Sequence, residues 1–344
     1  MDSLTQIALG SAVGIAVMRR RTATWKAALW GGICGTLPDL DSLIDHGDPI
    51  SNMTFHRAES HALFYLTLAS VPIAWLVSRI SGEADRFGRW WLALWLVLIT
   101  HPLLDVMTVY GTQLALPFTD HPYAVGSIFI IDPLYTLPLL IGVIAALVAD
   151  GRRGLRWNAI GLGLSTAYLA WSVVAQQVVL DVARESLQAQ GIPARKVLVT
   201  PAPFNTLLWR VVAITPGGYV EGFRSLLDDE PHMQFDHFRR DEALFSRLQD
   251  NWHVARIAWF SHGFFKMEEH DGQVTISDLR MGMEPYYSFT FVVARRNSAR
   301  LSPVSPLLIE DEDFVDVGAV LRWLWRRMRG EILPPPRPEP TGPA

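Results

Sequence analysis

Histidines and carboxylates recur together at the edges of apolar runs in the first 135 residues of the chain. Imidazole and carboxylate groups are the side chains that hold divalent metal ions, and zinc accepts both. Counting the apolar runs as membrane crossings brings these groups to one face of a membrane. The pattern therefore predicts a metal site assembled from segments that are far apart in sequence, namely residues 38–41, 56–61, 101–105, 120–121 and 132–133.

The first segment contains two aspartates, Asp39 and Asp41, directly after Pro38. A residue that precedes proline avoids the helical conformation, so we expect a helix to end at Leu37. In an extended segment, side chains two residues apart face the same side, and both carboxylates could then bind one ion. An acidic turn that only ends a helix is the alternative interpretation of this pair.

The second segment contains His56 and His61, which are five residues apart. On an ideal helix this spacing separates them by about 140°, so they fit a loop better than one helix face. We expect Ser60 to cap the following helix, with His61 in its first turn. Arg57 could hold a phosphate or an anionic transition state, and Glu59 could act as a general base. Ordinary interfacial polar groups remain the alternative.

The third segment contains His101 and Asp105, which are four residues apart and so share one helix face. Pro102 between them is expected to kink or restart the helix. Asp105 could be a metal ligand, a general base, or a partner that orients His101. A simple hydrogen bond that caps the helix is also open.

The last two segments are weaker candidates. Asp120 and His121 lie in a predicted loop. Asp132 precedes Pro133 and an apolar run, which is the arrangement of a helix N-cap with proline at the first helical position. A structural role is therefore the simpler interpretation of Asp132.

Composition narrows the class of protein. Half of the 344 residues are hydrophobic, only 19% are charged, and the net charge is −4, which gives no indication of a nucleic-acid partner. The single cysteine, Cys34, excludes disulfides and cysteine-based zinc sites within the chain and is expected to be a small buried apolar residue. The chain lacks a phosphate-binding loop, a dinucleotide fingerprint, a Gly-x-Ser-x-Gly elbow and a His-Glu-x-x-His helix.

Six apolar runs, each about as long as a membrane-spanning helix or somewhat shorter, must position these histidines and carboxylates. Several approach the roughly 17–25 residues that cross a bilayer, while the first two are shorter and could form a tilted or re-entrant pair. We predict an α-helical transmembrane bundle of about 5–6 spans. The runs are residues 4–18, 25–37, 62–80, 90–104, 133–149 and 157–180.

Basic residues in alternate loops predict the orientation. The loops at residues 38–61 and 105–132 hold one basic residue between them, Arg57. The positive-inside rule places the arginine-rich loops in the cytoplasm, and the metal site and carboxyl-terminal part in the periplasm. We therefore predict a multi-pass protein of the bacterial inner membrane. The cytoplasmic residues are Arg19, Arg20, Arg21, Lys26, Arg79, Arg86, Arg89, Arg152, Arg153 and Arg156.

After about residue 181 the composition changes to a polar helical stretch (181–190) and then to stretches with β-type alternation. These are residues 196–200, 207–214, 219–227, 256–268, 274–278 and 286–295, and Asp271-Gly272 is a hairpin-turn signal between two of them. Residues 316–328 predict an amphipathic helix. We expect a transmembrane domain over 1–180, a small β-rich extramembrane domain over 181–330, and a Pro-rich disordered tail over 331–344.

Several sequence segments resemble a known family when taken together: MDSLTQ at 1–6, GTLPDLD at 35–41, FHRAESH at 55–61, THPLLD at 100–105, YGT at 110–112 and TPAPFNTLLWR at 200–210. They resemble the YdjM-like family of bacterial inner-membrane proteins, described as metal-dependent hydrolases, and the resemblance covers nearly the whole chain. Gln6 stands where many relatives have a histidine, which puts a second metal in question. Ala58 stands where many have glycine, and Ala62 where serine is frequent.

We therefore expect a membrane-bound metal-dependent hydrolase. A divalent metal, expected to be zinc, would activate water to attack an ester or phosphoester of a lipid or other amphiphile at the outer membrane–water interface. Membrane lipids are the expected surroundings and possible substrates, and Glu59, Arg57 and Asp105 are the candidate catalytic residues. The expected ligands of one or two ions are Asp39, Asp41, His56, His61, His101 and Asp105.

Two other classes remain open at this point. One is a non-enzymatic membrane protein that binds an unknown protein partner through its carboxyl-terminal domain. The other is a transporter, because ionisable groups within membranes often mark ion pathways. A transporter should carry charges along the middle of its spans, whereas here they cluster at the outward ends.

Overall fold

The computed structural model describes residues 1–149, 151–297, 300–309 and 316–337. The chain forms two compact units, and the division between them falls within one long helix. A helical unit contains Met1–Asp45, Phe55–Val173 and Pro203–Asn205. A β-rich unit contains His46–Thr54, Val174–Ala202 and Thr206–Ala344. A helical amino-terminal region followed by a β-sheet domain was predicted, and both are present.

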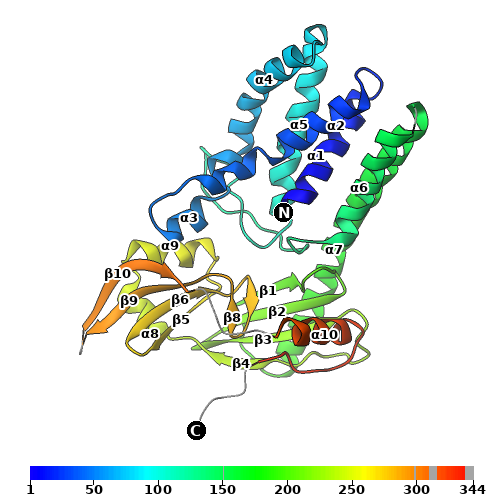
Figure 1. Ribbon diagram of the computed structural model, residues 1–344. Coiled ribbons are helices and arrows are strands. Elements are labelled where there is room, and N and C mark those ends of the chain that lie inside the picture. The colour runs from blue at the N-terminus through cyan, green and yellow to red at the C-terminus, as the bar shows by residue number, and fades with distance from the viewer. Residues whose placement is uncertain (150, 298–299, 310–315, 338–344) are drawn as a thin grey trace. The chain divides into compact units, whose positions relative to one another are not determined.

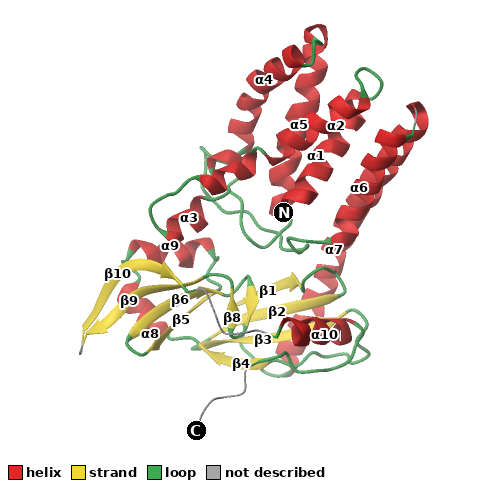
Figure 2. Cartoon of the chain, in the orientation of Figure 1, coloured by secondary structure: helices red, strands yellow, loops and turns green. Residues whose placement is uncertain are grey.

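The helical unit is a bundle of apolar helices joined by turns and by longer connections at residues 37–62 and 107–132 (Figures 1 and 2). Helix α1 packs against α2, α5 and α6, and α4 packs against α5. The connections include the 3₁₀ turns η1 (Pro38–Leu43), η2 (Glu59–His61) and η3 (Ala84–Arg86). The helices are α1 (Ser3–Met18), α2 (Thr24–Thr36), α4 (Leu63–Ile80), α5 (Phe87–Val106), α6 (Pro133–Val148) and the first part of α7 (Gly151–Ala189).

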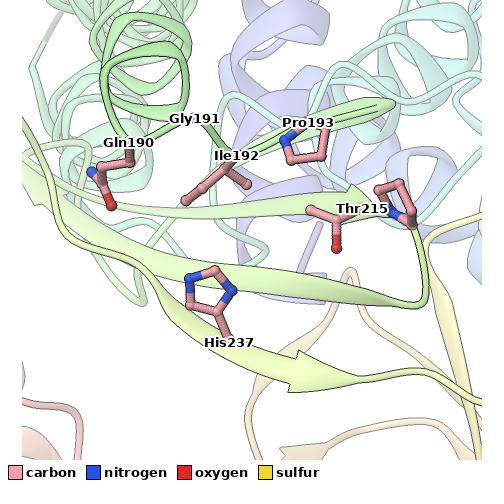
Figure 3. A pocket seen from close by; sticks show the side chains of 7 residues that line it. Gln190, Gly191, Ile192, Pro193, Thr215 and His237 are labelled. Atoms are coloured by element: carbon pink, nitrogen blue, oxygen red, sulfur yellow. The ribbon is translucent and has the colours of Figure 1, made fainter.

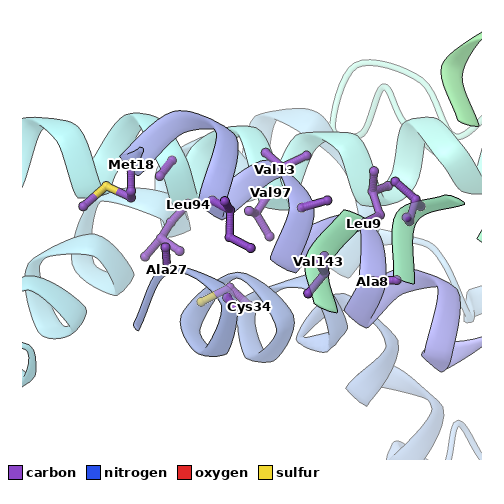
Figure 4. Close-up of a cluster of buried hydrophobic side chains, with 14 of the residues drawn as sticks. Ala8, Leu9, Val13, Met18, Ala27, Cys34, Leu94, Val97 and Val143 are labelled. Atoms are coloured by element: carbon purple, nitrogen blue, oxygen red, sulfur yellow. The ribbon is translucent and has the colours of Figure 1, made fainter. Parts of the chain in front are cut away.

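Buried apolar side chains from α1, α2, α4, α5 and α6 form the core of the unit, part of which is shown in Figure 4. Because all its neighbours are apolar, Cys34 behaves as the small buried residue that its sequence context predicts, with 2% of its surface exposed. The labelled members of the cluster in Figure 4 are Ala8, Leu9, Val13, Met18, Ala27, Cys34, Leu94, Val97 and Val143.

Helices α1 and α2 approach closely because glycines line their contact. A Cβ atom added to Gly10 would lie 2.2 Å from the carbonyl oxygen of Gly31. One added to Gly31 would lie 2.3 Å from the carbonyl oxygen of Gly10. Small residues of this kind let helix backbones pack directly in a membrane. The glycine contact continues to Gly35 near the end of α2, shortly before Asp39 and Asp41.

Three helical segments are long and apolar enough to cross a membrane within the described residues: Leu63–Ile80, Ala84–Val106 and Gly151–Ala189. Ser3–Met18 and Pro133–Val148 are apolar but shorter. Helix α2 has only 13 residues. Transmembrane helices are therefore supported, while the count of five or six spans stays a prediction.

Helix α7 joins the last apolar run to the polar stretch after residue 181 in a single helix of 39 residues. In its second half, Ala175, Val179, Ala183 and Leu187 are buried and pack against the first sheet of the β-rich unit. The spacing of four places them on one helix face. The change from apolar to polar composition near residue 181 therefore does not end the helix. It marks the part of α7 that packs against the first sheet.

The β-rich unit contains two antiparallel four-stranded sheets, with strand orders β1-β2-β3-β4 and β10-β9-β6-β5. A short pair, β7 (Gly282–Met283) and β8 (Tyr286–Tyr287), accompanies them. The first sheet comprises β1 (Lys196–Pro201), β2 (Leu208–Thr215), β3 (Gly218–Ser225) and β4 (Asp236–Arg239). The second comprises β5 (Phe265–His270), β6 (Gln273–Asp278), β9 (Thr290–Asn297) and β10 (Arg300–Leu308).

The hairpin turn predicted at Asp271-Gly272 is present. His270 pairs with Gln273, so Asp271-Gly272 is the two-residue turn of the β5–β6 hairpin. Both turn residues have positive φ, 49° for Asp271 and 72° for Gly272. This is the backbone geometry of a type I′ hairpin turn, which favours this dipeptide.

The predicted strand over residues 256–268 is wrong in its first half, where helix α9 (Trp252–Phe260) forms. Asn251 caps this helix, because its side chain accepts hydrogen bonds from the backbone of His253 and Val254. The buried side chains of Val254, Ile257 and Phe260 follow a helical spacing. The apolar residues in this stretch therefore obey a helical period rather than strand alternation.

The remaining helices are α3 (Pro49–Phe55), α8 (Glu242–Leu248) and α10 (Val317–Met328). The predicted amphipathic helix is α10; Asp316 caps it and its Trp323 is buried. Of the predicted tail, residues 331–337 have no helix or strand, and Arg337 bonds to Asp236 at 2.8 Å. Residues 338–344 lie outside the described part of the chain.

Candidate metal centre

Four side chains from three segments of the helical unit converge on one point. Asp39 comes from the turn η1 after α2, His61 from η2, and His101 and Asp105 from the end of α5. One ligand atom from each residue lies within 4.8 Å of all the others. His61, His101 and Asp105 are buried, and Asp39 is partly exposed. The predicted sharing of one face of α5 by His101 and Asp105 is correct, because α5 continues through Pro102.

The separations between these ligand atoms match a tetrahedral zinc site. The two histidine Nε2 atoms are 3.1 Å apart. Each lies 3.4 Å from Asp39 Oδ1 and 3.3 Å from Asp105 Oδ2. With metal–ligand distances of about 2.0–2.1 Å, the edges of a tetrahedron are about 3.3–3.4 Å long. Four of the six edges therefore have the length that a zinc-sized ion requires, and the Nε2–Nε2 edge is slightly shorter.

Hydrogen bonds on the far side of each imidazole set its tautomer. His101 Nδ1 lies 2.6 Å from the carbonyl oxygen of Gly35, which only accepts, so Nδ1 carries the hydrogen. Ser60 donates its hydroxyl to Asp41 and lies 2.8 Å from His61 Nδ1, so this nitrogen also donates. In both neutral rings the lone pair is then on Nε2. The two lone pairs face each other, which is unfavourable unless a proton or a cation lies between them.

The two carboxylate oxygens of Asp105 have different surroundings. Its Oδ1 accepts from Gln6 Nε2 at 3.2 Å, lies 3.5 Å from Arg57 Nη2, and contacts the α-amino group of Met1. Its Oδ2, which faces the two imidazoles, is buried without a hydrogen-bond partner. Buried polar atoms are almost always paired, so an orphaned carboxylate oxygen fits a metal ligand. The residues present therefore suit a divalent cation.

The electrostatics of the loop residues agree with this picture. Burial lowers the pKa of His61, but the neighbouring carboxylates of Asp105, Asp39 and Asp41 raise it to about 9, so this position favours a positive charge, whether a proton or a cation supplies it. Burial would raise the pKa of Asp39, but hydrogen bonds with His101 and His61 hold it well below its ordinary value. The carboxylates thus stay ionised and favour a positive charge at the centre.

Asp41 and His56 lie beside the four-residue cluster and support it. Asp41 accepts from His56 Nδ1 at 2.8 Å, from the backbone N–H of Arg57 at 2.9 Å and from Ser60. The prediction of an extended Asp39–Asp41 segment is wrong, because residues 38–43 form a 3₁₀ turn. With three residues per turn, side chains two apart point in different directions. Asp39 therefore faces the cluster and Asp41 faces the His56 loop.

Comparison with known families decides where this chain belongs. A family model described as YdjM inner membrane protein matches residues 1–179. The chain belongs to this YdjM family. A relative from Bacillus subtilis (strain 168), named Uncharacterized protein YfhP, is 24% identical over 309 residues, covering 85% of this chain and 90% of the relative. No solved structure matches. The YdjM match includes every residue of the cluster.

Two positions that depart from the YdjM-like pattern lie close to the centre. Gln6 is buried, and its amide also lies 3.4 Å from the carbonyl oxygen of His101. A side chain at position 6 thus reaches the cluster, although here it contacts Asp105 as a hydrogen-bond donor. Ala58 is buried beside the turn η2. Within the described residues, one group of metal-binding side chains is found in this YdjM protein.

The other predicted catalytic residues have different surroundings. Arg57 is buried with a positive φ of 64°, and its guanidinium lies 4.9 Å from the ring of Tyr110. It contacts Thr108 and Asp105, so its nearest role is to balance the charge of Asp105. Glu59 is exposed on η2. Whether Glu59 acts in catalysis stays a prediction.

The surroundings of four further polar residues can be compared with those predicted: Ser60, Asp120, His121 and Asp132. Ser60 does not cap α4, which begins at Leu63 after Ala62; the Ser60 hydroxyl instead links His61 to Asp41. This link was missed, although the adjacency of Ser60 and His61 was a signal for it. Asp132 caps α6 as predicted, since its side chain accepts from the backbone of Leu134. Asp120 and His121 are exposed and lie outside the cluster.

A separate pocket lies in the β-rich unit (Figure 3). Its volume is about 360 Å³, and its lining includes Gln190, Thr215 and His237. No carboxylate lines it, and it contains a single histidine. It therefore lacks the ligand chemistry that distinguishes the Asp/His cluster.

Proposed function

We propose that this YdjM family member is a membrane-embedded, metal-dependent hydrolase. Asp39, His61, His101 and Asp105 would hold one divalent cation, and their two imidazoles and two carboxylates suit zinc. The observation that carries the proposal is the pair of facing Nε2 lone pairs beside the orphaned oxygen of Asp105. A cation held there would polarise a substrate oxygen and lower the pKa of water.

The surrounding residues of this chain would orient the centre and move protons. The Gly35 carbonyl and the Ser60 hydroxyl hold the two imidazoles with Nε2 inward. His56 is held by Asp41 at 2.8 Å and is partly exposed, so it can exchange a proton with water. Arg57 would balance negative charge that develops near Asp105. We therefore assign His56 as the general base, and Glu59 is the alternative candidate for that role.

Location suggests the substrate class. Arginine-rich loops alternate with the loops that carry the centre, so we propose a multi-pass inner-membrane protein of five to six spans, with the centre and the β-rich unit on the periplasmic side. The two shorter apolar helices, Ser3–Met18 and Pro133–Val148, would complete the spans or line them. A site at the bilayer surface favours an ester or phosphoester of an amphiphile, such as a lipid headgroup.

Metal content tests the proposed centre. Detergent-purified wild-type protein should contain about one zinc-like cation per chain by elemental analysis, and the His61→Ala/His101→Ala variant should contain none. The His121→Ala variant is the matched control, because His121 is exposed and outside the cluster. Equal metal in wild type and the double variant would refute the centre.

Hydrolysis tests the reaction and separates the two candidate bases. Released headgroup is measured with phosphatidylglycerol and phosphatidylethanolamine in mixed micelles. We expect His56→Gln to keep its metal and lose about 10²–10⁴-fold in rate, the usual contribution of a proton-transfer group. Glu59→Gln should retain most of the rate. The opposite result would assign the base to Glu59, and no release by metal-loaded wild type would reject these substrates.

A further inference from the structure

A second cavity in the β-rich unit has a charged lining that the metal centre does not explain. Its volume is about 530 Å³. Arg195, Lys196 and Arg240 line it from the first sheet and the segment after β4, while Trp259 and Phe265 come from α9 and β5. Cations from separate segments and aromatic rings thus face one hollow, with no carboxylate in the lining.

Arg240 is held in place without a polar partner for its side chain. Its guanidinium lies 4.1 Å from the centre of the Phe265 ring, so the ring holds the plane of the group. Its Nε is buried and has no hydrogen-bond partner among the described residues. Stacking leaves the N–H groups at the edge of the guanidinium available. A guanidinium fixed in this way is ready to donate two parallel hydrogen bonds to an anion.

Lys196 adds a second charge that no carboxylate balances. Its Nζ donates to the carbonyl oxygen of His262 at 2.7 Å, and no described carboxylate lies within 4.0 Å of it. Gly263, with φ of 83°, leaves room for the ammonium group: a Cβ there would lie 2.9 Å from Nζ. The turn after α9 is therefore shaped around the lysine head group.

The positive charge of Arg195, the third cation of the cavity, has only a distant and exposed carboxylate partner. Arg195 lies 3.8 Å from Glu242, and both side chains are largely exposed. Burial lowers the pKa of Arg240; the carboxylate of Glu242 partly opposes this lowering, and the positive charge of Arg195 adds to it. Like charges gathered in a hollow repel one another, so an anion bound between them would be stabilised by all three.

We propose that this cavity binds a phosphate group, with Arg240 as a two-pronged donor, Lys196 as a point charge and Arg195 at the rim. Planar guanidinium and compact ammonium groups together are the common recognition chemistry of phosphate. Trp259 would contact the apolar or ring-shaped part of the molecule that carries the phosphate. A phospholipid headgroup and a soluble phosphate ester share this chemistry. The proposal is independent of the metal centre and of hydrolysis.

Calorimetry on the full chain in a neutral detergent tests the cavity. The two probes are inorganic phosphate and water-soluble dibutyryl-phosphatidylglycerol. Arg240→Gln should weaken binding about tenfold or more, because it removes a charged hydrogen-bonding partner. Arg184→Gln is the matched control: it removes the same charge from an exposed site on α7. Each titration is repeated in the His61→Ala/His101→Ala background, which removes the proposed metal centre as a second site for phosphate and for phosphatidylglycerol hydrolysis; binding at the cavity should persist there.

The two probes distinguish a phospholipid headgroup from a soluble phosphate compound as the natural ligand. Tighter binding of the phosphatidylglycerol identifies a lipid headgroup as the natural ligand, and equal or tighter binding of phosphate identifies a soluble phosphate compound. If Arg240→Gln fails to fold by circular dichroism, Lys196→Gln takes its place with the same expected loss. No binding by the wild type, unchanged binding in both cavity variants, or equal losses in Arg184→Gln would overturn the proposal.

Discussion

Two buried clusters of ionisable groups, one in each unit of this protein, balance their charges in opposite ways. In the β-rich unit, Arg210 donates to Glu221 at 2.7 Å and to the carbonyl oxygen of Leu279 at 2.7 Å, while Lys266 donates to Glu284 at 2.9 Å. Both of these positive groups have a negative or carbonyl partner. In the helical unit, two carboxylates and two imidazoles meet with one carboxylate oxygen left unpaired.

This difference separates a network of matched charges from a cluster that could hold a cation. A network whose charges are already matched contributes to the stability and uniqueness of the fold and needs no ligand. A buried cluster with an excess of acceptors is favourable only when a cation completes it. Burial or polarity alone would not have separated the two, because both clusters are buried and rich in ionisable groups.

The largest expected effect comes from breaking the matched network. Glu221→Gln should lower the free energy of unfolding of the β-rich unit by about 3–5 kcal/mol, because it leaves the buried Arg210 charge uncompensated. Hydrogen exchange of β2 and β3 peptides measures this loss. The exposed Glu185→Gln should stay within about 0.5 kcal/mol of wild type. Wild-type protection in Glu221→Gln would show that the network contributes little.

Removing the cation should affect the other unit. At a free cation concentration of about 100 times Kd, chelation should cost about 2.7 kcal/mol of stability. Exchange should accelerate in peptides covering residues 55–61 and 100–105 and stay unchanged in β2 and β3. The His61→Ala/His101→Ala variant should not respond to the chelator. A uniform response of both units would mean that the cation acts elsewhere.

A smaller effect is expected from the residue that orients His61. Ser60→Ala removes the hydroxyl between His61 and Asp41, so the affinity for zinc should fall about 10–100-fold. Competition with a chelating dye measures this affinity. The matched control is Thr100→Ala, since the Thr100 hydroxyl donates only to carbonyls of its own helix although it neighbours His101. An unchanged affinity in Ser60→Ala would exclude the orienting role.

The smallest effect is expected from an acid outside the cluster. Asp120 is exposed, so Asp120→Asn should change neither metal content nor stability by more than about 0.5 kcal/mol. Asp39→Asn, the same chemical change inside the cluster, should lose metal by elemental analysis. Metal loss in Asp120→Asn would show that the loop reaches the centre.

Features that depend on neighbours in sequence could be predicted from the sequence. The Asp132 cap of α6, the Asp271-Gly272 turn and the apolar helices follow from local propensity and periodicity. The type of ligand was also predictable, and four of the six proposed ligands meet in one cluster. Short segments were less predictable. The 3₁₀ turn at Asp41 and helix α9 differ from the extended forms that were expected. In α9 the Asn251 cap and the helical spacing of its buried residues were local signals that the apparent strand alternation obscured.

Residue types and their spacing along single helices are properties of the chain itself, so the pairing of His101 with Asp105 on one face of α5 was already determined by sequence. The meeting of Asp39, His61 and α5, and the turning of Asp41 away from them, depended on how the helices pack. The physical reason is the sequence distance over which each effect acts. A helical period relates residues that are three or four positions apart. Residues that are far apart in sequence, such as Asp39 and His101, meet only when the α1–α2 glycine contact and the packing of α5 have fixed the ends of their helices.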